Sequence, residues 1–219
     1  MVFTPQLTTL PPPQRTLWPE LADTPATFTL YGGTALALRL GHRASVDFDF
    51  FSNAPFDPDV LGKELPYLKE AERIQVAANT LTCRVERGGP VLLSFFGGLG
   101  LGQAAAHDET RDTGLRVASL LDIAATKAAV LQKRAEVKDY LDMDALLTHG
   151  VDLPSALAAG TVVYGRSFNP LITLKALGYF DDLPALPDAV RARLGAAVAA
   201  VDVTRLPELT PYARRPDNV

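Results

Sequence analysis

Two aspartates one residue apart, Asp47 and Asp49, are the residues of this 219-residue chain best suited to chemistry. Strand side chains alternate between faces, so both carboxylates point the same way, while Val46, Phe48 and Phe50 point to the opposite face, where they can be buried. Two adjacent acids repel each other, and a bound divalent cation removes that cost. Carboxylate oxygens suit Mg²⁺ or Mn²⁺, and Mg²⁺ typically takes one or two carboxylates together with substrate phosphates. The pair therefore predicts a metal site that works on phosphates.

The Gly32-Gly33 pair, a short distance upstream, is the natural place for those phosphates. Glycine has no Cβ, so the backbone can approach an anion closely. A strand over 28–31 is predicted before the pair, and a helix over 35–40, with Thr34 as its cap, is predicted after it. The first turn of such a helix aims free N–H groups and the positive end of its dipole at the anion. The alternative is a glycine turn followed by an acidic surface strand, which the aromatic residues beside the two acids argue against.

The elements that must position these residues divide the chain into two predicted domains. An α+β half over 1–116, which starts with a proline-rich arm over 1–25, precedes an all-α half over 117–219. The elements predicted for the first half are a short helix near 14–22, strands over 28–31 and 46–51, helices over 35–40 and 57–68, and strands over 73–78, 80–86 and 91–96. The elements predicted for the second half are a helix capped by Ser119 that runs through 131, helices over 137–147, 154–164, 170–177 and 187–201, and an irregular tail from Pro207.

Charge and composition narrow the possible functions. A net charge of −4 and a pI near 5.4 argue against a general nucleic-acid coat protein, although they allow a local basic patch. The single cysteine, Cys83, excludes an intramolecular disulfide and is expected to be a buried thiol. The histidines have no metal-ligand spacing. No basic segment typical of a signal peptide is seen, and no apolar run reaches the roughly 18 residues of a membrane span, so we expect a cytoplasmic protein without a membrane partner.

A second group of charged residues lies in the predicted helical half. Lys127 and Arg134 are seven residues apart, so they share one helix face if that helix runs unbroken to residue 134. Asp139 and Asp142 are three apart on the helix that follows. A cationic face opposite an acidic sheet edge would bracket a metal-bound triphosphate. The alternative is a solvated helix end, with pairs such as Lys138–Asp142 that contribute only about 0.2–0.5 kcal/mol.

Together these residues resemble the AbiEii/AbiGii-type nucleotidyltransferases, which are abortive-infection toxins and their relatives with a polymerase-β-like core. The first matching motif covers 30–38 and 42–51. The second consists of Lys127, Arg134, Lys138-Asp139-Tyr140 and Asp142, and the run from 168 to 182 is also similar to some members. The resemblance implies an α+β fold, in which a polymerase-β-like nucleotidyltransferase core (a mixed sheet with flanking helices) is followed by an all-α C-terminal half that completes the active site.

The resemblance also implies a function, namely a metal-dependent transfer of a nucleoside monophosphate from an NTP to an acceptor. In some relatives the acceptor is the 3′ end of tRNA, and an antitoxin encoded beside the toxin neutralises it. Asp47 and Asp49 would then bind Mg²⁺ or Mn²⁺, Lys127 would contact the triphosphate, and Asp139 would be a second catalytic acid. Gly33 and Thr34 would bind phosphate. From their positions we also expect phosphate or nucleotide contacts from Gly32, Arg43, Ser45, Arg134 and Lys138, although the Ser45 hydroxyl could equally bond the local backbone.

One departure from this pattern leaves the mechanism open. Polymerase-β-like enzymes commonly carry a third carboxylate on a later strand, but the candidate strand over 91–96 has Ser94 as its only polar residue. Either Asp139 takes the role of this third carboxylate, or the acceptor reacts without a strong base, or the enzyme is impaired. A missing general base typically costs about 10²–10⁴ in rate. The alternatives are transfer to a protein or small-molecule hydroxyl, which the acidic pI favours over RNA, and a degenerate nucleotide-binding module without catalysis.

Overall fold

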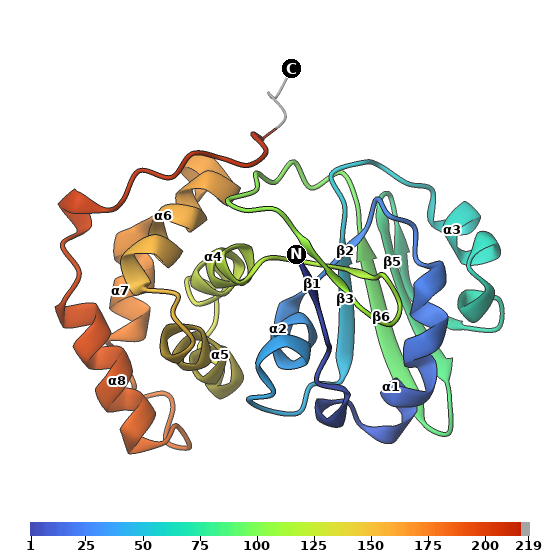
Figure 1. Cartoon of the computed structure of the whole chain (residues 1–219), viewed down its shortest axis with the longest axis horizontal. Coiled ribbons are helices and arrows are strands. Elements are labelled where there is room, and N and C mark those ends of the chain that lie inside the picture. The colour runs from blue at the N-terminus through green and yellow to red at the C-terminus, as the bar shows by residue number, and fades with distance from the viewer. Residues whose placement is uncertain (216–219) are drawn as a thin grey trace. The chain divides into compact units, whose positions relative to one another are not determined.

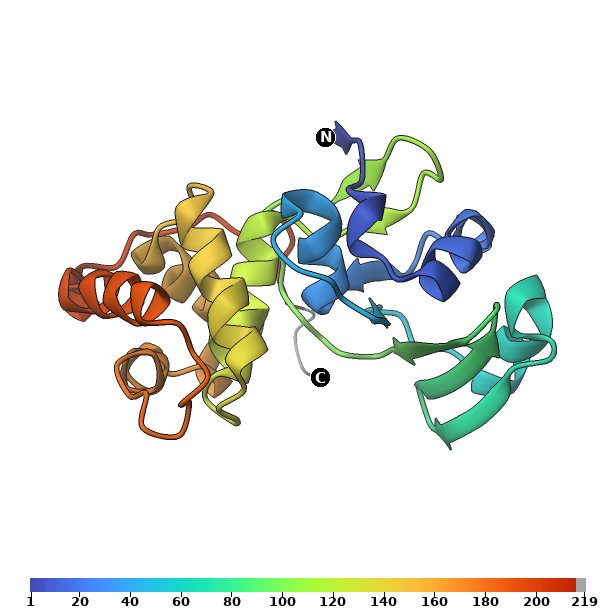
Figure 2. The ribbon, with the colours of Figure 1, turned by 90° about the horizontal axis from the view of Figure 1, so that it is seen from below.

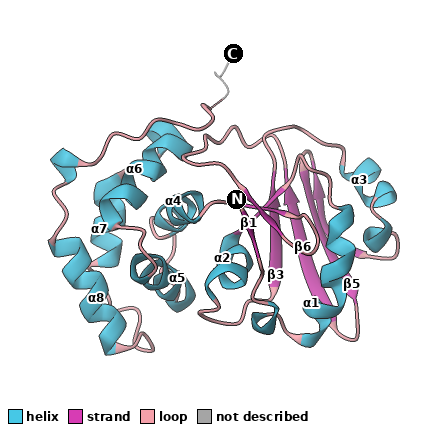
Figure 3. Cartoon of the chain, viewed as in Figure 1, coloured by secondary structure: helices cyan, strands magenta, loops and turns pink. Residues whose placement is uncertain are grey.

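The computed structural model describes residues 1–215, which form two compact units. The first unit comprises residues 1–100 and 107–118, and the second comprises residues 101–106 together with the chain from Ser119 onward. Figure 3 shows that the described strands belong to the first unit and that the second unit is built from helices. The mixed sheet and the helical second half confirm the expected architecture.

Eight strands form one mixed sheet in the first unit. Its order is β1-β7-β8-β2-β3-β6-β5-β4, in which β1 and β7, β8 and β2, and β3 and β6 pair in parallel. The strand bounds are β1 Val2–Phe3, β2 Thr29–Tyr31, β3 Asp47–Phe51, β4 Glu72–Ala77, β5 Thr80–Glu86, β6 Pro90–Phe96, β7 Asp108–Thr110 and β8 Arg116–Val117. The strands predicted from hydrophobic patterning, β2 to β6, are confirmed to within two residues at each end.

The strand β3 has the predicted alternation of faces. Phe48 and Phe50 are fully buried, while Asp47 and Asp49 are only partly buried. The Phe50 ring stacks on Phe95 at 4.9 Å between centroids, and such aromatic pairs hold the core on this face of the sheet. The prediction for Val46 is wrong, because the strand begins one residue later and the Val46 side chain is 49% exposed.

The helices of the first unit are short. They are α1 Pro12–Leu17, α2 Gly32–Leu40 and α3 Pro58–Glu64, with 3₁₀ turns η1 Leu7–Thr9, η2 Trp18–Asp23 and η3 Pro66–Leu68. Figure 1 shows α2 on one side of β3 and α1 on the other, and Figure 2 gives the same unit from below. The single helix predicted over 57–68 stops at Glu64, since the backbone before Pro66 is extended. The helix predicted near 14–22 starts earlier, and its second half is 3₁₀.

Three short strands, β1, β7 and β8, were not predicted from the sequence. Each has two or three residues, which is too short for an apolar alternation to be read. Tertiary contacts hold them, since Asp108 of β7 accepts a hydrogen bond from Arg39 of α2 at 2.5 Å. The pairing of Val117 with Leu30 joins the β7–β8 hairpin to β2.

Five helices make up most of the second unit. They are α4 Leu120–Val130, α5 Val137–Thr148, α6 Leu153–Tyr164, α7 Pro170–Leu177 and α8 Asp188–Ala199, followed by a 3₁₀ turn η5 Val203–Arg205. All five were predicted, and α7 has the predicted bounds. The Ser119 hydroxyl accepts the hydrogen bond from the N–H of Asp122 at 2.9 Å, which confirms the predicted cap of α4. Apolar side chains that include Tyr140, Met143 and Leu157 form the core of this unit.

Asp122 ties the segment 101–106 to the helical unit. Its side chain is 1% exposed and accepts hydrogen bonds from the N–H groups of Ala104 at 2.7 Å and Ala105 at 3.3 Å. Burial raises the pKa of the Asp122 carboxyl above its ordinary value, although the hydrogen bonds from Ser119 and the two backbone N–H groups oppose that shift. An acid therefore anchors the point at which the chain first enters this unit.

Three further predictions concern the cysteine, membrane-spanning helices and the C-terminal tail. Cys83 is buried on β5 as predicted, and burial raises the pKa of its thiol. Within residues 1–215, a helix long and apolar enough to span a membrane is not found; Val137–Thr148 and Leu153–Ser167 meet such a criterion only as a pair bent by 115°. The tail from Pro207 lacks helices as far as the structure describes it, and its last four predicted residues, 216–219, lie outside the described residues.

Candidate active site

The glycine turn leads directly into a helix. The helix α2 begins at Gly32, immediately after β2, and Gly32 has a positive φ of 76° that L side chains rarely adopt. Tyr31 occupies the N-cap position, and its side chain makes no capping hydrogen bond to the helix. The prediction that Thr34 caps a helix over 35–40 is therefore wrong, because Thr34 lies inside the first turn. The N–H groups of that turn have no side-chain cap from Tyr31 and remain suited to an anion.

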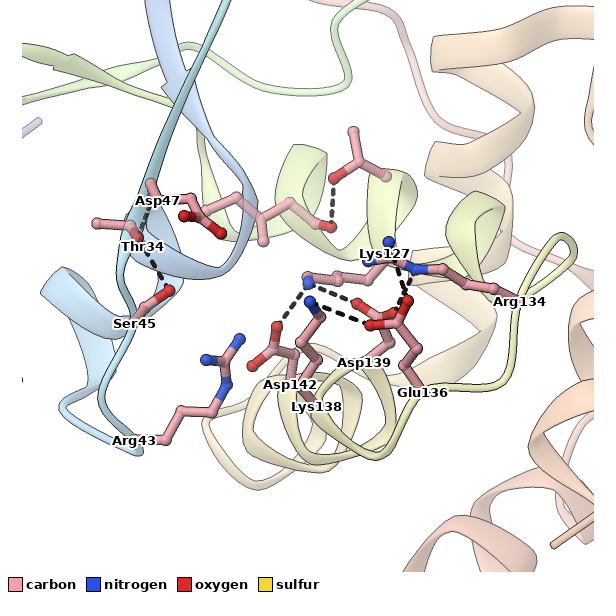
Figure 4. Close-up of polar contacts among 12 residues, drawn as sticks. Thr34, Arg43, Ser45, Asp47, Lys127, Arg134, Glu136, Lys138, Asp139 and Asp142 are labelled. Carbon is pink, nitrogen blue, oxygen red and sulfur yellow. Dashed lines mark hydrogen bonds and ion pairs between the residues drawn. The ribbon is translucent and has the colours of Figure 1, made fainter. Parts of the chain in front are cut away.

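Thr34 instead connects α2 to the start of β3. Its side chain is 1% exposed, and its hydroxyl donates to the main-chain carbonyl oxygen of Asp47 at 2.5 Å. The same hydroxyl oxygen lies 2.9 Å from the Ser45 Oγ, as Figure 4 shows. Thr34 thus holds Ser45 and the first residue of the acidic strand, Asp47, in place, and direct contact between Thr34 and phosphate stays a prediction.

Three polar side chains border the two glycines. A Cβ on Gly32 would lie 2.8 Å from the Oδ2 of Asp49, and a Cβ on Gly33 would lie 3.2 Å from the Ser45 Oγ and overlap the Arg43 guanidinium. A Cβ at either position would therefore displace these side chains, and Gly32 also needs glycine for its backbone conformation. The fold brings the backbone of two glycines, a cation, a hydroxyl and a carboxylate to one place, and it stays a prediction that Gly32, Gly33, Arg43, Ser45 and Asp49 bind phosphate and metal there.

The two acids of β3 lie on one face of the sheet, and both are partly exposed. A group of three or more histidine, cysteine, aspartate or glutamate side chains arranged around a metal position does not occur among residues 1–215. Two carboxylates suit a Mg²⁺ ion that takes its other ligands from phosphate oxygens and water, rather than a cage of protein ligands. Asp47 and Asp49 therefore fit a metal that binds together with a phosphate substrate.

The strand next to β3 has no acid at the level of this pair. The strand β6 runs parallel to β3, with Leu92 opposite Asp47 and Ser94 opposite Asp49. Ser94 is buried and accepts a hydrogen bond from the hydroxyl of Thr82, on β5, at 3.3 Å. The predicted candidate strand therefore lies where a third carboxylate would stand, and it places a hydroxyl there.

In the second unit, a lysine and two aspartates form a buried cluster. Lys127, on α4, is 6% exposed, and Asp139 and Asp142, on α5, are fully buried. The Lys127 Nζ lies 2.8 Å from Asp139 Oδ1 and 2.5 Å from Asp142 Oδ2 (Figure 4). The spacing of three residues on α5 puts both carboxylates on one helix face, where they share one ammonium group.

Exposed charges surround the buried cluster. Arg134 donates from Nε to Asp139 Oδ2 at 2.9 Å, so both oxygens of Asp139 are bound by cations. Glu136 accepts ion pairs from Arg134 at 3.2 Å and from Lys138 at 3.0 Å (Figure 4). The expected shared helix face of Lys127 and Arg134 does not form, because α4 ends at Val130 and Arg134 lies in the following turn. The sequence signal for Asp142, its spacing from Asp139, was present, but its pairing with Lys127 was not predicted.

Three comparisons place the chain among known proteins. The family described as "Nucleotidyl transferase AbiEii toxin, Type IV TA system" matches residues 17–210. An uncharacterised protein of Aquifex aeolicus is 32% identical over 158 residues, which cover 71% of this chain and 74% of that protein. The solved structure of MenT4, a nucleotidyltransferase toxin of Mycobacterium tuberculosis, matches with a TM-score of 0.56 over 86% of this chain and 82% of that chain. At 18% identity, this last match concerns the fold.

Proposed function

The chain belongs to the AbiEii nucleotidyl transferase toxin family of type IV toxin–antitoxin systems, and from that premise we propose that it transfers a nucleoside monophosphate from an NTP to a hydroxyl acceptor with the help of Mg²⁺. Nucleotidyltransferases of this family take NTP as substrate, and toxins of this type are paired with an antitoxin. The metal, the acceptor and the residue roles are our proposal.

The convergence of side chains around the glycine turn carries this proposal. Gly33 borders the Arg43 guanidinium and the Ser45 hydroxyl, and Gly32 borders the Asp49 carboxylate. The first turn of α2 offers N–H groups without a side-chain cap from Tyr31. A triphosphate bound there would be neutralised by the arginine and by the helix end, and its metal would be held by the acids.

In the proposed reaction, an acceptor hydroxyl attacks the α-phosphate of the NTP. The acceptor hydroxyl oxygen forms a bond to the α-phosphorus, the bond from that phosphorus to the β-bridging oxygen breaks, and pyrophosphate leaves. Asp47 and Asp49 would hold Mg²⁺, which supplies charge neutralisation at the phosphates when bound. Arg43, Ser45 and the glycine backbone hold the triphosphate in position, so that little covalent work is left to the protein.

The helical unit contributes Lys127 and Asp139 in our proposal, as the family pattern implies. Both are bound inside the protein, since Lys127 bridges two carboxylates and Asp139 lies between Lys127 and Arg134. Lys127 would therefore exchange one carboxylate partner to reach a phosphate oxygen. Asp139 would likewise release one cation before it accepts the proton of the acceptor hydroxyl. Arg134 and Lys138 would bind nucleotide only after Glu136 is displaced.

The acceptor we propose first is the 3′ hydroxyl of tRNA. The support is the family pattern, in which some relatives act on tRNA, and the Arg43 guanidinium beside the glycine turn suits a phosphate group. An overall pI near 5.4 instead favours a protein or small-molecule hydroxyl, so the test must include those acceptors.

A transfer assay tests the proposal. We would incubate the protein with Mg²⁺, each of four α-labelled NTPs, and either total tRNA or a protein extract, beside Asp47→Ala. We expect label on tRNA with one preferred NTP, and a loss of about 10³-fold or more in the variant, because metal neutralisation of the phosphates supplies several kcal/mol. Retained transfer by Asp47→Ala would sink the assignment of the metal pair. Label on protein alone would replace the tRNA acceptor, and NTP binding without any transfer would indicate a degenerate site.

A further inference from the structure

The N-terminal arm holds the segment that leads into the acidic strand. Residues 42–46 lie outside any strand, although they carry Arg43 and Ser45 and end at the residue before Asp47. Two hydrogen bonds from the arm fix this segment from outside the sheet. The Ser45 N–H donates to the carbonyl oxygen of Thr9 at 3.3 Å, and the Gln14 Nε2 donates to the carbonyl oxygen of Val46 at 3.0 Å.

The same arm is also hydrogen-bonded to the C-terminal part of α2. The N–H of Gln6 donates to the carbonyl oxygen of Leu38 at 2.7 Å, and the Thr9 hydroxyl donates to the carbonyl oxygen of Gln6 at 2.7 Å. The arm is therefore attached both to the helix that starts at the glycine turn and to the segment before β3. On its other side, that segment is bound by Thr34 through Asp47.

Gln14 reaches this segment from the arm through its side chain, and the environment of that side chain is unusual. It is 5% exposed, and its Oε1 is buried without a hydrogen-bond partner in the described chain. A carbonyl oxygen can only accept, so the amide nitrogen must face Val46. A buried amide with half of its groups unpaired is a poor contributor to stability. The Gln14 side chain therefore acts mainly through its hydrogen bond to the Val46 carbonyl oxygen.

We propose that Gln14 is a positioning residue of the phosphate- and metal-binding end of β3. It acts through the Val46 carbonyl group, and so holds Ser45 and Asp47 at the distances that the glycine turn requires. This inference rests on the proposed function, because it assumes that Ser45, Asp47 and the turn bind a metal-bound phosphate chain. It adds a residue from outside the two family motifs to the site.

The test compares two variants of the same helix. Gln14→Met keeps the side-chain volume and removes the donor, whereas Leu17→Ala removes a fully buried side chain of α1 that makes no hydrogen bond to Val46. Two quantities are measured on the full chain, well below the unfolding temperature of each variant. They are the hydrogen-exchange rate of the peptide covering 42–50 and the affinity for tripolyphosphate with Mg²⁺, measured by calorimetry.

We expect faster exchange over 42–46 and a two- to tenfold weaker tripolyphosphate affinity in Gln14→Met only, which is the effect of about one hydrogen bond. Leu17→Ala should lower the melting temperature more and leave both readouts unchanged. Parallel losses in both variants, or unchanged readouts in Gln14→Met, would overturn the role of Gln14. If the wild-type protein itself binds no tripolyphosphate, the proposed phosphate site fails, and the role of Gln14 is overturned with it. Binding by the wild type and an unchanged Gln14→Met would overturn the role of Gln14 alone.

Discussion

Each unit contains a pair of neighbouring carboxylates that repel each other, and the surroundings of the two pairs are opposite in character. In the sheet unit, Asp47 and Asp49 are partly exposed, and the Asp47 carboxylate forms no ion pair within its own unit. In the helical unit, Asp139 and Asp142 are fully buried and share the Lys127 ammonium. The Asp47 carboxylate is open to a cation from outside, whereas Asp139 and Asp142 already have a cation from the chain. Identical side chains thus have different roles because burial and partners differ.

The largest effect is expected when the internal cation is removed. Lys127→Ala should destabilise the protein by about 3–5 kcal/mol, because it leaves two buried carboxylates without their ammonium partner. Urea unfolding measures this change. The matched control is Lys138→Ala, whose side chain is half exposed and pairs with Glu136, and which should cost less than about 1 kcal/mol. Similar losses in the two variants would contradict the contrast between buried and exposed pairs.

A third acid beside the first pair should sharpen the contrast. Ser94→Asp places a carboxylate opposite Asp49, and without metal the added repulsion and burial should cost about 1–3 kcal/mol. Mg²⁺ or Mn²⁺ should then raise the melting temperature of this variant more than that of the wild type. Thermal unfolding with and without the metal checks this expectation, with Ser94→Asn as the uncharged control. An equal metal response of both variants would show that a carboxylate at position 94 does not contribute to binding the ion.

Removal of one acid from the first pair should hardly change stability. Without a metal, Asp47→Asn should alter the free energy of unfolding by less than about 0.5 kcal/mol, since it removes a repulsion and breaks no ion pair within the sheet unit. Asp139→Asn, by comparison, should cost several kcal/mol, because Lys127 and Arg134 both lose a charged partner. Urea unfolding of both variants in a metal chelator gives the comparison, and equal destabilisation would refute it.

An effect that depends on pH is expected for Asp122, an acid with hydrogen bonds to Ser119 and to backbone N–H groups, and with no cation partner among the described residues. Burial raises its pKa in the folded state, so the folded protein keeps this proton at a pH where the unfolded chain has released it. The wild type should therefore lose stability relative to Asp122→Asn as the pH rises from about 3.9 toward the raised value, by less than about 1.4 kcal/mol per pH unit. A difference that shrinks with rising pH would contradict the direction of the shift.

Much of the fold could be predicted from local patterns, and the failures have identifiable causes. The alternation around Phe48 and Phe50 and the cap at Ser119 are local signals, and both are confirmed. The strands β7 and β8 have too few residues to show a pattern, and they exist because other strands pair with them. Val46 lies outside β3, since its carbonyl group is bound to Gln14 instead of a neighbouring strand.

The candidate site, like the fold, could be predicted from the sequence only in part. The sequence identified the side chains around the glycine turn, because a motif of adjacent residues carries them, and the structure brings Arg43, Ser45 and Asp49 to Gly32 and Gly33. Their roles toward phosphate and metal remain predictions. Spacing alone could not reveal that Lys127 is already bound by two carboxylates, or that Gln14 reaches Val46 across 32 positions. Such contacts depend on tertiary structure and leave no periodic signal.

The entry of residues 101–106 into the helical unit has a consequence for synthesis on the ribosome. The N–H of Gln103 donates to the carbonyl oxygen of Ala213, which is 110 residues (213 minus 103) further along the chain. At a translation speed of roughly 5–20 residues per second, Gln103 waits about 5–20 s before its partner exists. The strands that flank this segment can pair long before that moment. The nascent protein can therefore complete its sheet before Gln103 has its partner, and a premature stop near the C-terminus would leave the Gln103 N–H without the Ala213 carbonyl group.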